Sequence, residues 1–153
     1  MPGSSPSPAP PSDVAEVAAR LRLSVTRLSR RLRREAPAGH SPSQVSALVT
    51  INAHGPLTLG ALADHERVAP PSITKVVAKL EADGLVERAA DANDGRVMLV
   101  STTKAGRDFV AESRRRKTSW LTERVRELPP EEQARLAEAL DVLDHLTTLG
   151  DEG

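Results

Sequence analysis

The chain has 153 residues, a hydrophobic fraction of 39% and a formal net charge of zero at pH 7, which suits one folded domain with a real core. The sequence contains no cysteine, which excludes disulfides, thiolate metal sites and cysteine redox sensing. It has no signal-peptide pattern and no stretch approaching the ~20 apolar residues of a membrane span, so we expect a cytoplasmic protein with no membrane partner.

The first part of the chain divides into a tail and a long helix. Residues 1–12 are almost wholly Pro, Ser, Ala and Gly, a composition that buries too little apolar area to offset its chain entropy, and we expect a disordered tail there. From Val14 onward apolar residues recur at steps of three or four, which predicts a helix that Pro37 and Gly39 end. The apolar stripe consists of Val14, Val17, Leu21, Val25, Leu28 and Leu32.

Residues 20–34 of this helix are strongly basic. This stretch holds seven arginines and no acid: Arg20, Arg22, Arg27, Arg30, Arg31, Arg33 and Arg34. Such a run is either a solvated helix face or a surface for a polyanion, and both interpretations stay open.

Three more helices follow, each with its own start signal. The segment SPSQ at 41–44 has the pattern of a capping box with proline at the first helical position, and predicts a second helix to about Ala53. After the break at 54–56, Thr58 can cap a short third helix that stops near Val68. Prolines 70 and 71 then start a fourth helix, which residues 83 and 84 (Asp-Gly) end.

The fourth helix has one apolar face and one polar face. Ile73, Val76, Val77 and Leu80 fall at i, i+3, i+4 and i+7 and are the predicted core face. The hydrogen-bonding and cationic side chains of Ser72, Thr74, Lys75 and Lys79 are left to point outward. Groups of these kinds contact base edges and phosphates, although an exposed polar face is by itself more often only solvated.

A hairpin and two further helices complete the chain. Residues 85–88 and 97–100 are β-prone and are separated by turn formers, which predicts a hairpin with a polar tip. Thr103 can cap a fifth helix of about 24 residues, and Pro129 with Pro130 separates it from a sixth. The apolar stripe of the sixth helix consists of Leu136, Leu140, Leu143 and Leu146.

The order helix, short helix, tight turn, helix, hairpin is that of a helix-turn-helix with a wing, spanning about 41–102. The predicted fold class is therefore mainly α with a small β-hairpin wing, an α/β winged helix-turn-helix joined to a helical dimerisation region. A helix with the fourth helix's outward groups has the right width for the major groove of double-stranded DNA.

An ordered series of short motifs resembles the MarR family of bacterial regulators over about 14–149. The motifs are LGALA at 59–63, VAPPSITKVV at 68–77, LEADGLVER at 80–88, DGR at 94–96 and TKAG at 103–106. The resemblance implies one MarR-type domain at 13–149, with the winged module at about 41–102 and dimerisation helices at about 13–36 and 103–149.

The resemblance also implies which residues contact DNA. The helix starting at Pro71 would enter the major groove, with Ser72, Thr74 and Lys75 reading bases and Lys79 contacting a phosphate. Arg96 of the wing would lie in or beside the minor groove with Asp94 bracing it, and Ser43 and Gln44 would hold the phosphate backbone. The expected set is Ser43, Gln44, Pro71, Ser72, Thr74, Lys75, Lys79, Asp94 and Arg96.

The chain departs from the family pattern in two places. Ala69 stands where many members have a serine able to cap the recognition helix, which predicts a weaker cap by about 1 kcal/mol. Residues 64–100 hold more acids than bases, so we expect DNA affinity to be modest or strongly salt-dependent.

The apolar stripes of the first, fifth and sixth helices require a partner surface. Pairing two copies would cover them and set two recognition helices about one DNA turn, ~34 Å, apart, which predicts a homodimer on a pseudo-palindromic operator. An intramolecular three-helix packing is the alternative. The resemblance implies repression as the default outcome and leaves a small-molecule effector open; Trp120 and Phe109 would supply an aromatic effector site poorly.

Other classes of protein have less support. No catalytic constellation can be assembled, because His65 and Glu66 lack the second histidine of the metalloprotease motif and no nucleophile motif is present. We expect no enzyme, no cofactor and no metal site. Two alternatives remain: a metal-responsive regulator using His40, His54, His65 and His145, which zinc titration would reveal, and a winged-helix module that binds protein.

Overall fold

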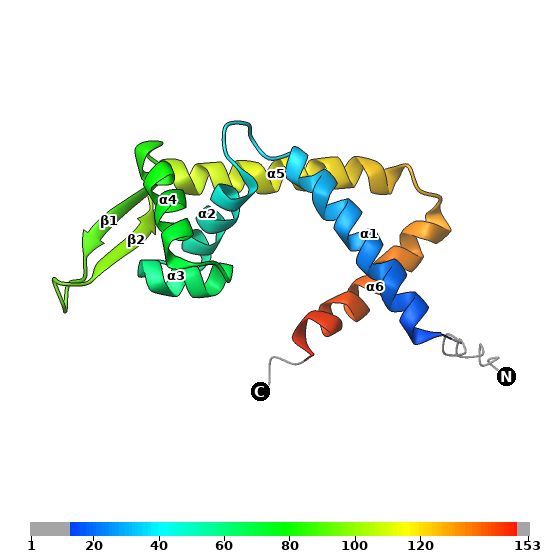
Figure 1. Cartoon of the computed structure of the whole chain (residues 1–153). Helices are drawn as coiled ribbons and strands as arrows, with labels where there is room; N and C mark the ends of the chain where they lie inside the picture. The colour runs from blue at the N-terminus through cyan, green and yellow to red at the C-terminus, as the bar shows by residue number, and fades with distance from the viewer. Residues whose placement is uncertain (1–12, 150–153) are drawn as a thin grey trace. The chain divides into compact units, whose positions relative to one another are not determined.

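The computed structural model describes residues 13–149, and the predicted tail at 1–12 lies outside them. The described part is mainly helical, with six helices and one hairpin (Figure 1). It divides into two units, Met1–Arg34 and Glu35–Gly153. The second unit carries the winged module.

The described part of the first unit is a single amphipathic helix, α1 (Val14–Arg34). Asp13 caps it, since its Oδ1 atom accepts hydrogen bonds from the backbone N–H groups of Ala15 and Glu16 at 2.9 and 3.3 Å. No residue of α1 is buried; of the predicted stripe, Val14, Val17, Val25 and Leu28 are exposed, and Leu21 and Leu32 are half-buried. The helix therefore has the predicted apolar stripe.

The start of α2 (Pro42–His54) has the predicted capping box. The Ser41 hydroxyl accepts from the Gln44 backbone N–H at 3.2 Å, and the Gln44 Oε1 atom accepts from the Ser41 backbone N–H at 2.9 Å. Pro42 occupies the first helical position, where a missing N–H costs nothing.

The helices α3 (Leu59–Glu66) and α4 (Pro70–Ala82) form the helix-turn-helix. Thr58 caps α3 through a 3.1 Å hydrogen bond from the Ala61 N–H. The turn between the helices contains Arg67 in the left-handed region, at φ 54°. At the end of α4, Gly84 has φ +72°, and the N–H groups of Gly84 and Leu85 bond back to the Glu81 and Leu80 carbonyls, as in a Schellman motif.

The hydrophobic core lies between α2, α3, α4 and the hairpin. The predicted core face of α4 is confirmed for Ile73, Val77 and Leu80, whereas Val76 is only partly buried. The largest fully buried side chains are Leu48, Ile51, Leu62, Leu80, Val77 and Val100. Thr50 of α2 also donates a 2.5 Å hydrogen bond to Glu66 of α3, which ties the first two helices of the module together.

The wing consists of β1 (Val86–Ala90) and β2 (Met98–Thr102), paired antiparallel with Arg88 opposite Val100. The predicted strands at 85–88 and 97–100 begin one residue too early and end two too soon. Ala89 and Ala90 have low β propensity, but they pair across the hairpin with residues 99 and 98. Val100 also bonds with Leu57 in both directions, at 2.7 and 3.0 Å, so the hairpin is anchored to the segment before α3.

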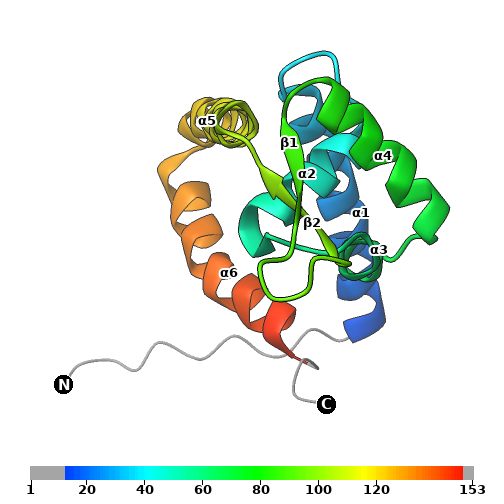
Figure 2. The same ribbon diagram turned by 90° about the vertical axis from the view of Figure 1, so that its left-hand side faces the viewer.

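Helix α5 (Lys104–Arg126) starts directly at the base of the hairpin, and Figure 2 views it nearly end-on, next to β1. Its cap, Thr103, accepts from the Gly106 N–H at 3.1 Å and donates to the Gly84 carbonyl at 2.6 Å. Gly106 lies so close to the Leu85 carbonyl that a Cβ at residue 106 would be 2.0 Å from its oxygen. The end of α4 is thus held against the start of α5.

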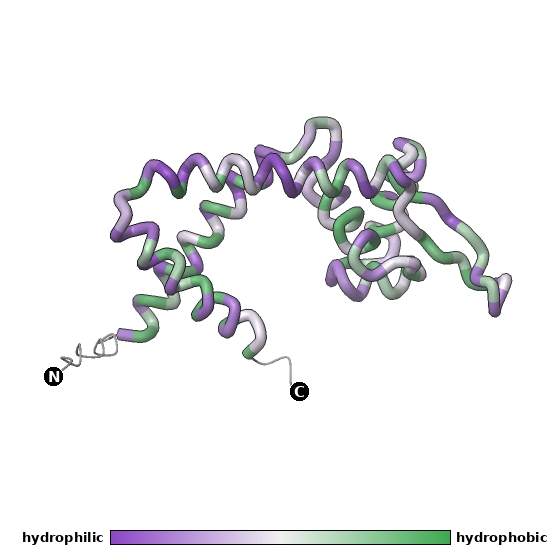
Figure 3. The backbone as a smooth tube through the Cα atoms, turned by 180° about the vertical axis from the view of Figure 1, so that it is seen from behind, coloured by the Kyte–Doolittle hydropathy of each residue, from purple (hydrophilic) through white to green (hydrophobic). Residues whose placement is uncertain are grey.

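Helix α6 (Pro130–Thr148) follows the predicted proline break. Hydrophobic and hydrophilic residues alternate along it (Figure 3), and none of its residues is buried. Leu140 and Leu146 of the predicted stripe are 52% and 48% exposed. Like α1, this helix has exposed apolar side chains at helical spacing.

Candidate nucleic-acid interface

The outward face of α4 carries all the polar groups expected there. Ser72, Thr74, Lys75 and Lys79 are exposed, while Ile73, Val77 and Leu80 anchor the opposite face in the core. The helical repeat places Pro71, Lys75 and Ala78 on the side directly away from the core, with Lys79 and Ser72 toward one flank and Thr74 at the other. The small side chain of Ala78 leaves room for the helix to approach another surface closely.

The polar groups of this face differ in whether they already have a hydrogen-bond or ion-pair partner within the chain. The Thr74 hydroxyl donates to the Pro70 carbonyl at 3.0 Å, which leaves its oxygen able to accept. The Lys79 ammonium donates to Asp83 at 2.8 Å, so a phosphate would have to compete with that carboxylate. Lys75 has no ion-pair partner among the described residues. Lys75 is therefore the most available cation on α4.

The Asp83 carboxylate accepts hydrogen bonds from two side chains, Lys79 and His40. The hydrogen bond from Lys79 holds the pKa of the Asp83 carboxyl below its ordinary value, and a hydrogen bond from His40 acts in the same direction against the opposing effect of burial. Asp83 is consequently a carboxylate at neutral pH.

Two aspartates fold the tip of the wing. The Asp91 Oδ1 atom accepts from the N–H groups of Asn93 and Asp94 at 2.6 and 3.2 Å. The Asp94 Oδ1 atom accepts from the Arg96 backbone N–H at 3.1 Å. These are local turns of the kind that aspartate favours. They leave the Arg96 side chain exposed, and its guanidinium has no ion pair within residues 13–149.

A salt bridge joins the wing to the recognition helix. The Nε atom of Arg88 on β1 lies 3.2 Å from a carboxylate oxygen of Glu81 on α4, and the Arg88 side chain is 27% exposed. The pair joins the two elements as an ion pair only, since the buried Arg88 Nε atom makes no hydrogen bond among the described residues. The wing and α4 are thus presented together.

The acids of this region are mostly engaged inside the molecule. Glu66, Glu81, Asp83, Asp91 and Asp94 each bond to a group of the chain itself. Of these acids, only Glu81 and Asp83 are paired with basic side chains, so the region keeps its excess of negative charge, while Lys75 and Arg96 are exposed cations that a polyanion can reach.

The predicted phosphate-binding residues of α2 lie at its first turn. Ser43 is exposed, and Gln44 uses its Oε1 atom in the capping box. The amide nitrogen of Gln44 can still donate, as can the Ser43 hydroxyl. Their position at a helix N-terminus adds the positive end of the helix dipole.

Arg67 was not predicted as part of this site. It lies in the turn before α4, is exposed, and adopts a positive φ that is uncommon for a side chain other than Gly, Asn or Asp. Within the described part of the chain its guanidinium has no ion pair. The sequence gives no signal for this conformation, because no glycine marks the turn.

The missing cap of α4 is confirmed. Ala69 makes no side-chain hydrogen bond, and because residues 70 and 71 are prolines the first free N–H belongs to Ser72, which bonds to the Ala69 carbonyl at 2.9 Å. We expect Ala69→Ser to raise the free energy of unfolding by about 0.5 to 1 kcal/mol, since a serine oxygen can accept from that N–H. Urea unfolding checks this, with Ala69→Val as the control that should show no gain; equal values for the two variants would refute a capping effect.

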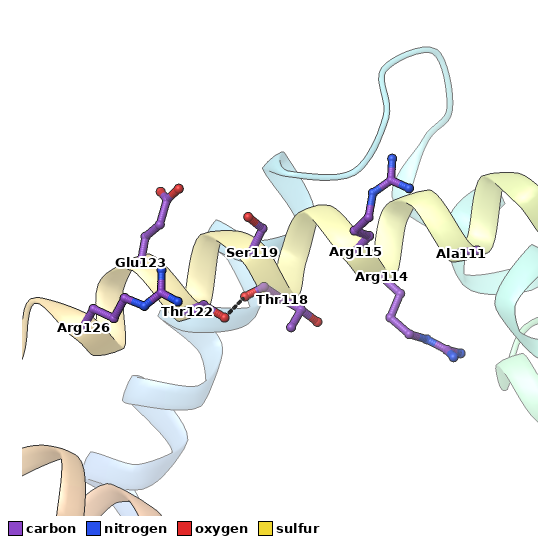
Figure 4. A pocket seen from close by; sticks show the side chains of 8 residues that line it. All are labelled: Ala111, Arg114, Arg115, Thr118, Ser119, Thr122, Glu123 and Arg126. Carbon is purple, nitrogen blue, oxygen red and sulfur yellow. Dashed lines mark hydrogen bonds between the residues drawn. The ribbon is translucent and has the colours of Figure 1, made fainter.

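A shallow hollow of about 580 Å³ runs along one side of α5. Figure 4 shows Arg114 and Arg115 pointing in different directions and Arg126 lying far along the helix from both. Arg115 is paired with Glu112, while Thr122 bonds to the Thr118 carbonyl at 2.8 Å. The cations do not converge on a common point, so the hollow has no defined binding geometry.

No cluster of three or more His, Cys, Asp or Glu side chains capable of holding a metal ion occurs between residues 13 and 149. His54 and His65 stack with ring centroids 4.7 Å apart. No helix in that range has the length and apolar character needed to cross a bilayer.

A helix-turn-helix with an exposed polar recognition helix and an arginine-tipped wing defines a winged helix-turn-helix DNA-binding module. The model of the MarR family matches residues 41–98. An HTH-type transcriptional regulator of Mycobacterium bovis, itself uncharacterised, is 45% identical over 130 residues, covering 84% of this chain and 91% of that protein. The HTH-type transcriptional repressor MdtR of Bacillus subtilis is 31% identical over 68 residues, 44% of each chain.

Solved structures agree with this. The crystal structure of a transcriptional regulator from Pseudomonas aeruginosa has 33% identity and a TM-score of 0.79, covering 92% of this chain and 99% of that one. The chain belongs to the MarR family. It is a DNA-binding transcription regulator, and not an enzyme.

Proposed function

We propose that the protein is a homodimeric repressor that binds a pseudo-palindromic operator in double-stranded DNA in the cytoplasm. The main observation in support is that α4 and the wing lie together in the winged module. Lys75 on α4 and Arg96 on the wing are exposed and have no ion pair among residues 13–149, so both are available to DNA.

We assign base contacts to Ser72, Thr74 and Lys75, with Pro71 starting the helix that enters the major groove. Lys79, Ser43 and Gln44 supply phosphate contacts, and Arg96 reaches the minor groove with Asp94 fixing the turn that presents it. The exposed donors of Ser43, Ser72, Thr74, Lys75, Lys79 and Arg96 support their assignments. Gln44 is half-buried but keeps a free amide nitrogen, and Asp94 contributes by accepting from the Arg96 backbone N–H.

The homodimer is supported by the exposed apolar side chains of α1 and α6. Neither helix has a buried residue, yet each has exposed leucines and valines at helical spacing, such as Leu28 at 44% and Leu140 at 52%. Exposed apolar side chains that line one face of a helix are typical of a protein interface. An isologous pairing would cover both copies at once and set two recognition helices in register with an inverted repeat.

Repression is supported by the relative MdtR, whose name describes a transcriptional repressor. A bound regulator that overlaps a promoter blocks polymerase without further machinery. The proposal assigns no effector site within the described residues, because the hollow along α5 has no convergent polar groups. Release by a small molecule would then use a site that the dimer forms.

We expect Lys75→Ala to weaken operator binding by about 1 to 3 kcal/mol and to change the preferred base at one or two positions. The reason is that Lys75 lies on the outward side of α4 with an uncompensated charge. Binding to a set of single-base operator variants checks this, with Lys104→Ala, which removes an exposed lysine from the start of α5, as the control. A uniform loss over all sequences would show that Lys75 contacts only phosphate.

We expect Arg96→Ala to weaken binding most on operators with A·T-rich flanks. A narrow minor groove concentrates negative potential, which attracts an inserted arginine. The measurement is the ratio of affinities for A·T-rich and G·C-rich flanks in the wild type and in the variant. The same loss on both flanks would argue against minor-groove recognition.

A further inference from the structure

His40 lies at the junction of three elements of the second unit. It belongs to the loop before α2, directly preceding the cap Ser41. Its Nε2 atom lies 3.1 Å from Oδ2 of Asp83, the residue that ends α4. Its ring meets the ring of Phe109 on α5 edge to face, with centroids 4.9 Å apart and planes at 75°. Only 14% of the side chain is exposed.

The direction of the His40–Asp83 hydrogen bond is fixed by chemistry. Asp83 is a carboxylate, and a carboxylate can only accept, so the Nε2 atom of His40 donates. The Nδ1 atom is buried and has no hydrogen-bond partner among the described residues. The hydrogen bond to Asp83 is therefore the one polar interaction that the structure gives this imidazole.

Lys79, the other side chain that donates to Asp83, cannot attach α4 to another element. Lys79 lies on α4 itself, so its bond to Asp83 cannot fix the helix relative to any other element. Thr103 holds the chain just beyond α4, through the Gly84 carbonyl at 2.6 Å. The Thr103 backbone N–H also donates to the Leu85 carbonyl at 3.1 Å, so Thr103 and His40 hold the end of α4 from two different elements.

We propose that His40 is a positioning residue for DNA recognition: its hydrogen bond to Asp83 ties the C-terminal end of α4 to the loop before α2, and because α2 packs against α5 this tie sets the angle of the recognition helix relative to α5. The role in DNA binding rests on the proposed function. Because α5 leads into α6, and α6 belongs to the proposed dimer interface, the angle between α4 and α5 sets the separation of the two recognition helices. His40 then determines which spacing of half-sites the dimer accepts.

Two amide variants test this, because they differ by one methylene. The nitrogen of His40→Gln occupies about the place of Nε2 and can still donate to Asp83, whereas the nitrogen of His40→Asn is nearer to the place of Nδ1 and falls short. Both variants lose the ring contact with Phe109, so the comparison isolates the hydrogen bond. Should His40→Asn fail to fold, His40→Leu replaces it as the variant without a donor.

The first measurement is hydrogen exchange without DNA. We expect the amides of Gly84 and Leu85 to exchange about tenfold faster in His40→Asn than in the wild type, and His40→Gln to remain near the wild type. Equal exchange in the two variants would overturn the His40–Asp83 tie, whether or not the protein binds DNA.

The second measurement uses inverted repeats whose centres are lengthened or shortened by one base pair. The wild type and His40→Gln should prefer one spacing, and His40→Asn should lose several-fold of that preference at a temperature where all three are folded. Loss of affinity by the same factor at every spacing would show a merely structural role and overturn the proposal. A wild type that binds no repeat would refute the proposed function, and the exchange result would then decide the His40–Asp83 tie alone.

Discussion

Leu140→Glu is expected to convert the protein from dimer to monomer and to weaken binding to a full inverted repeat by at least about a hundredfold. Burial of a leucine contributes about 1.5 to 3 kcal/mol, and an isologous interface counts the loss twice. Leu140 is 52% exposed on α6, so the single chain loses little from the change. A monomer also loses the avidity of two linked DNA-binding modules, which raises affinity by a factor of about 10² to 10⁴.

Sedimentation at several protein concentrations measures the first effect, and titration of a full repeat and of an isolated half-site measures the second. The matched control is Ala134→Glu, which places the same charge on an exposed residue at the opposite side of α6. The control should remain dimeric. If Leu140→Glu remained dimeric with unchanged affinity, α6 would not be part of the interface.

Gly106→Ala is expected to lower the free energy of unfolding by roughly 2 to 3 kcal/mol. The added methyl would lie 2.0 Å from the Leu85 carbonyl oxygen, which is backbone and cannot swing aside as a side chain can. Relief requires the start of α5 to move away from the end of α4, which strains the Thr103 hydrogen bond to the Gly84 carbonyl. The variant should therefore lose DNA affinity as well as stability.

Gly60→Ala provides the comparison for this substitution. Gly60 is an exposed glycine in α3, and a Cβ there would meet only the Thr58 hydroxyl oxygen at 3.9 Å, an ordinary contact. Alanine is favoured over glycine in helices by about 1 kcal/mol, so this variant should be as stable as the wild type or more so. Chemical unfolding of both variants separates the two cases. Similar stabilities would contradict the close contact between Gly106 and Leu85.

Helix ends and the faces of helices could be predicted from the sequence because they depend on neighbouring residues. Ser41 with Gln44 forms the capping box that their spacing indicates, and Gly84 ends α4 in the conformation that glycine allows. The periodicity of Ile73, Val77 and Leu80 likewise separated the core face of α4 from the polar face. The prediction of the strand ends is less accurate, since Ala89 and Ala90 have low β propensity.

The contacts that hold α4 in place could not be predicted, because they join residues that are distant in the sequence. His40 and Asp83 are 43 positions apart, and the close approach of Gly106 to the Leu85 carbonyl involves no motif. The pairing of Lys79 with Asp83 was within reach of the i, i+4 rule but competes with its predicted phosphate contact. The left-handed conformation of Arg67 has no sequence signal.

The most direct test of the DNA-recognition account is selection of bound duplexes from a random pool at two salt concentrations, using protein whose oligomeric state has been measured. We expect an enriched inverted repeat with half-sites about one helical turn apart, and an affinity that falls steeply as salt rises. Recovery of no motif, or binding that salt does not affect, would contradict the account and favour a winged helix that binds protein instead.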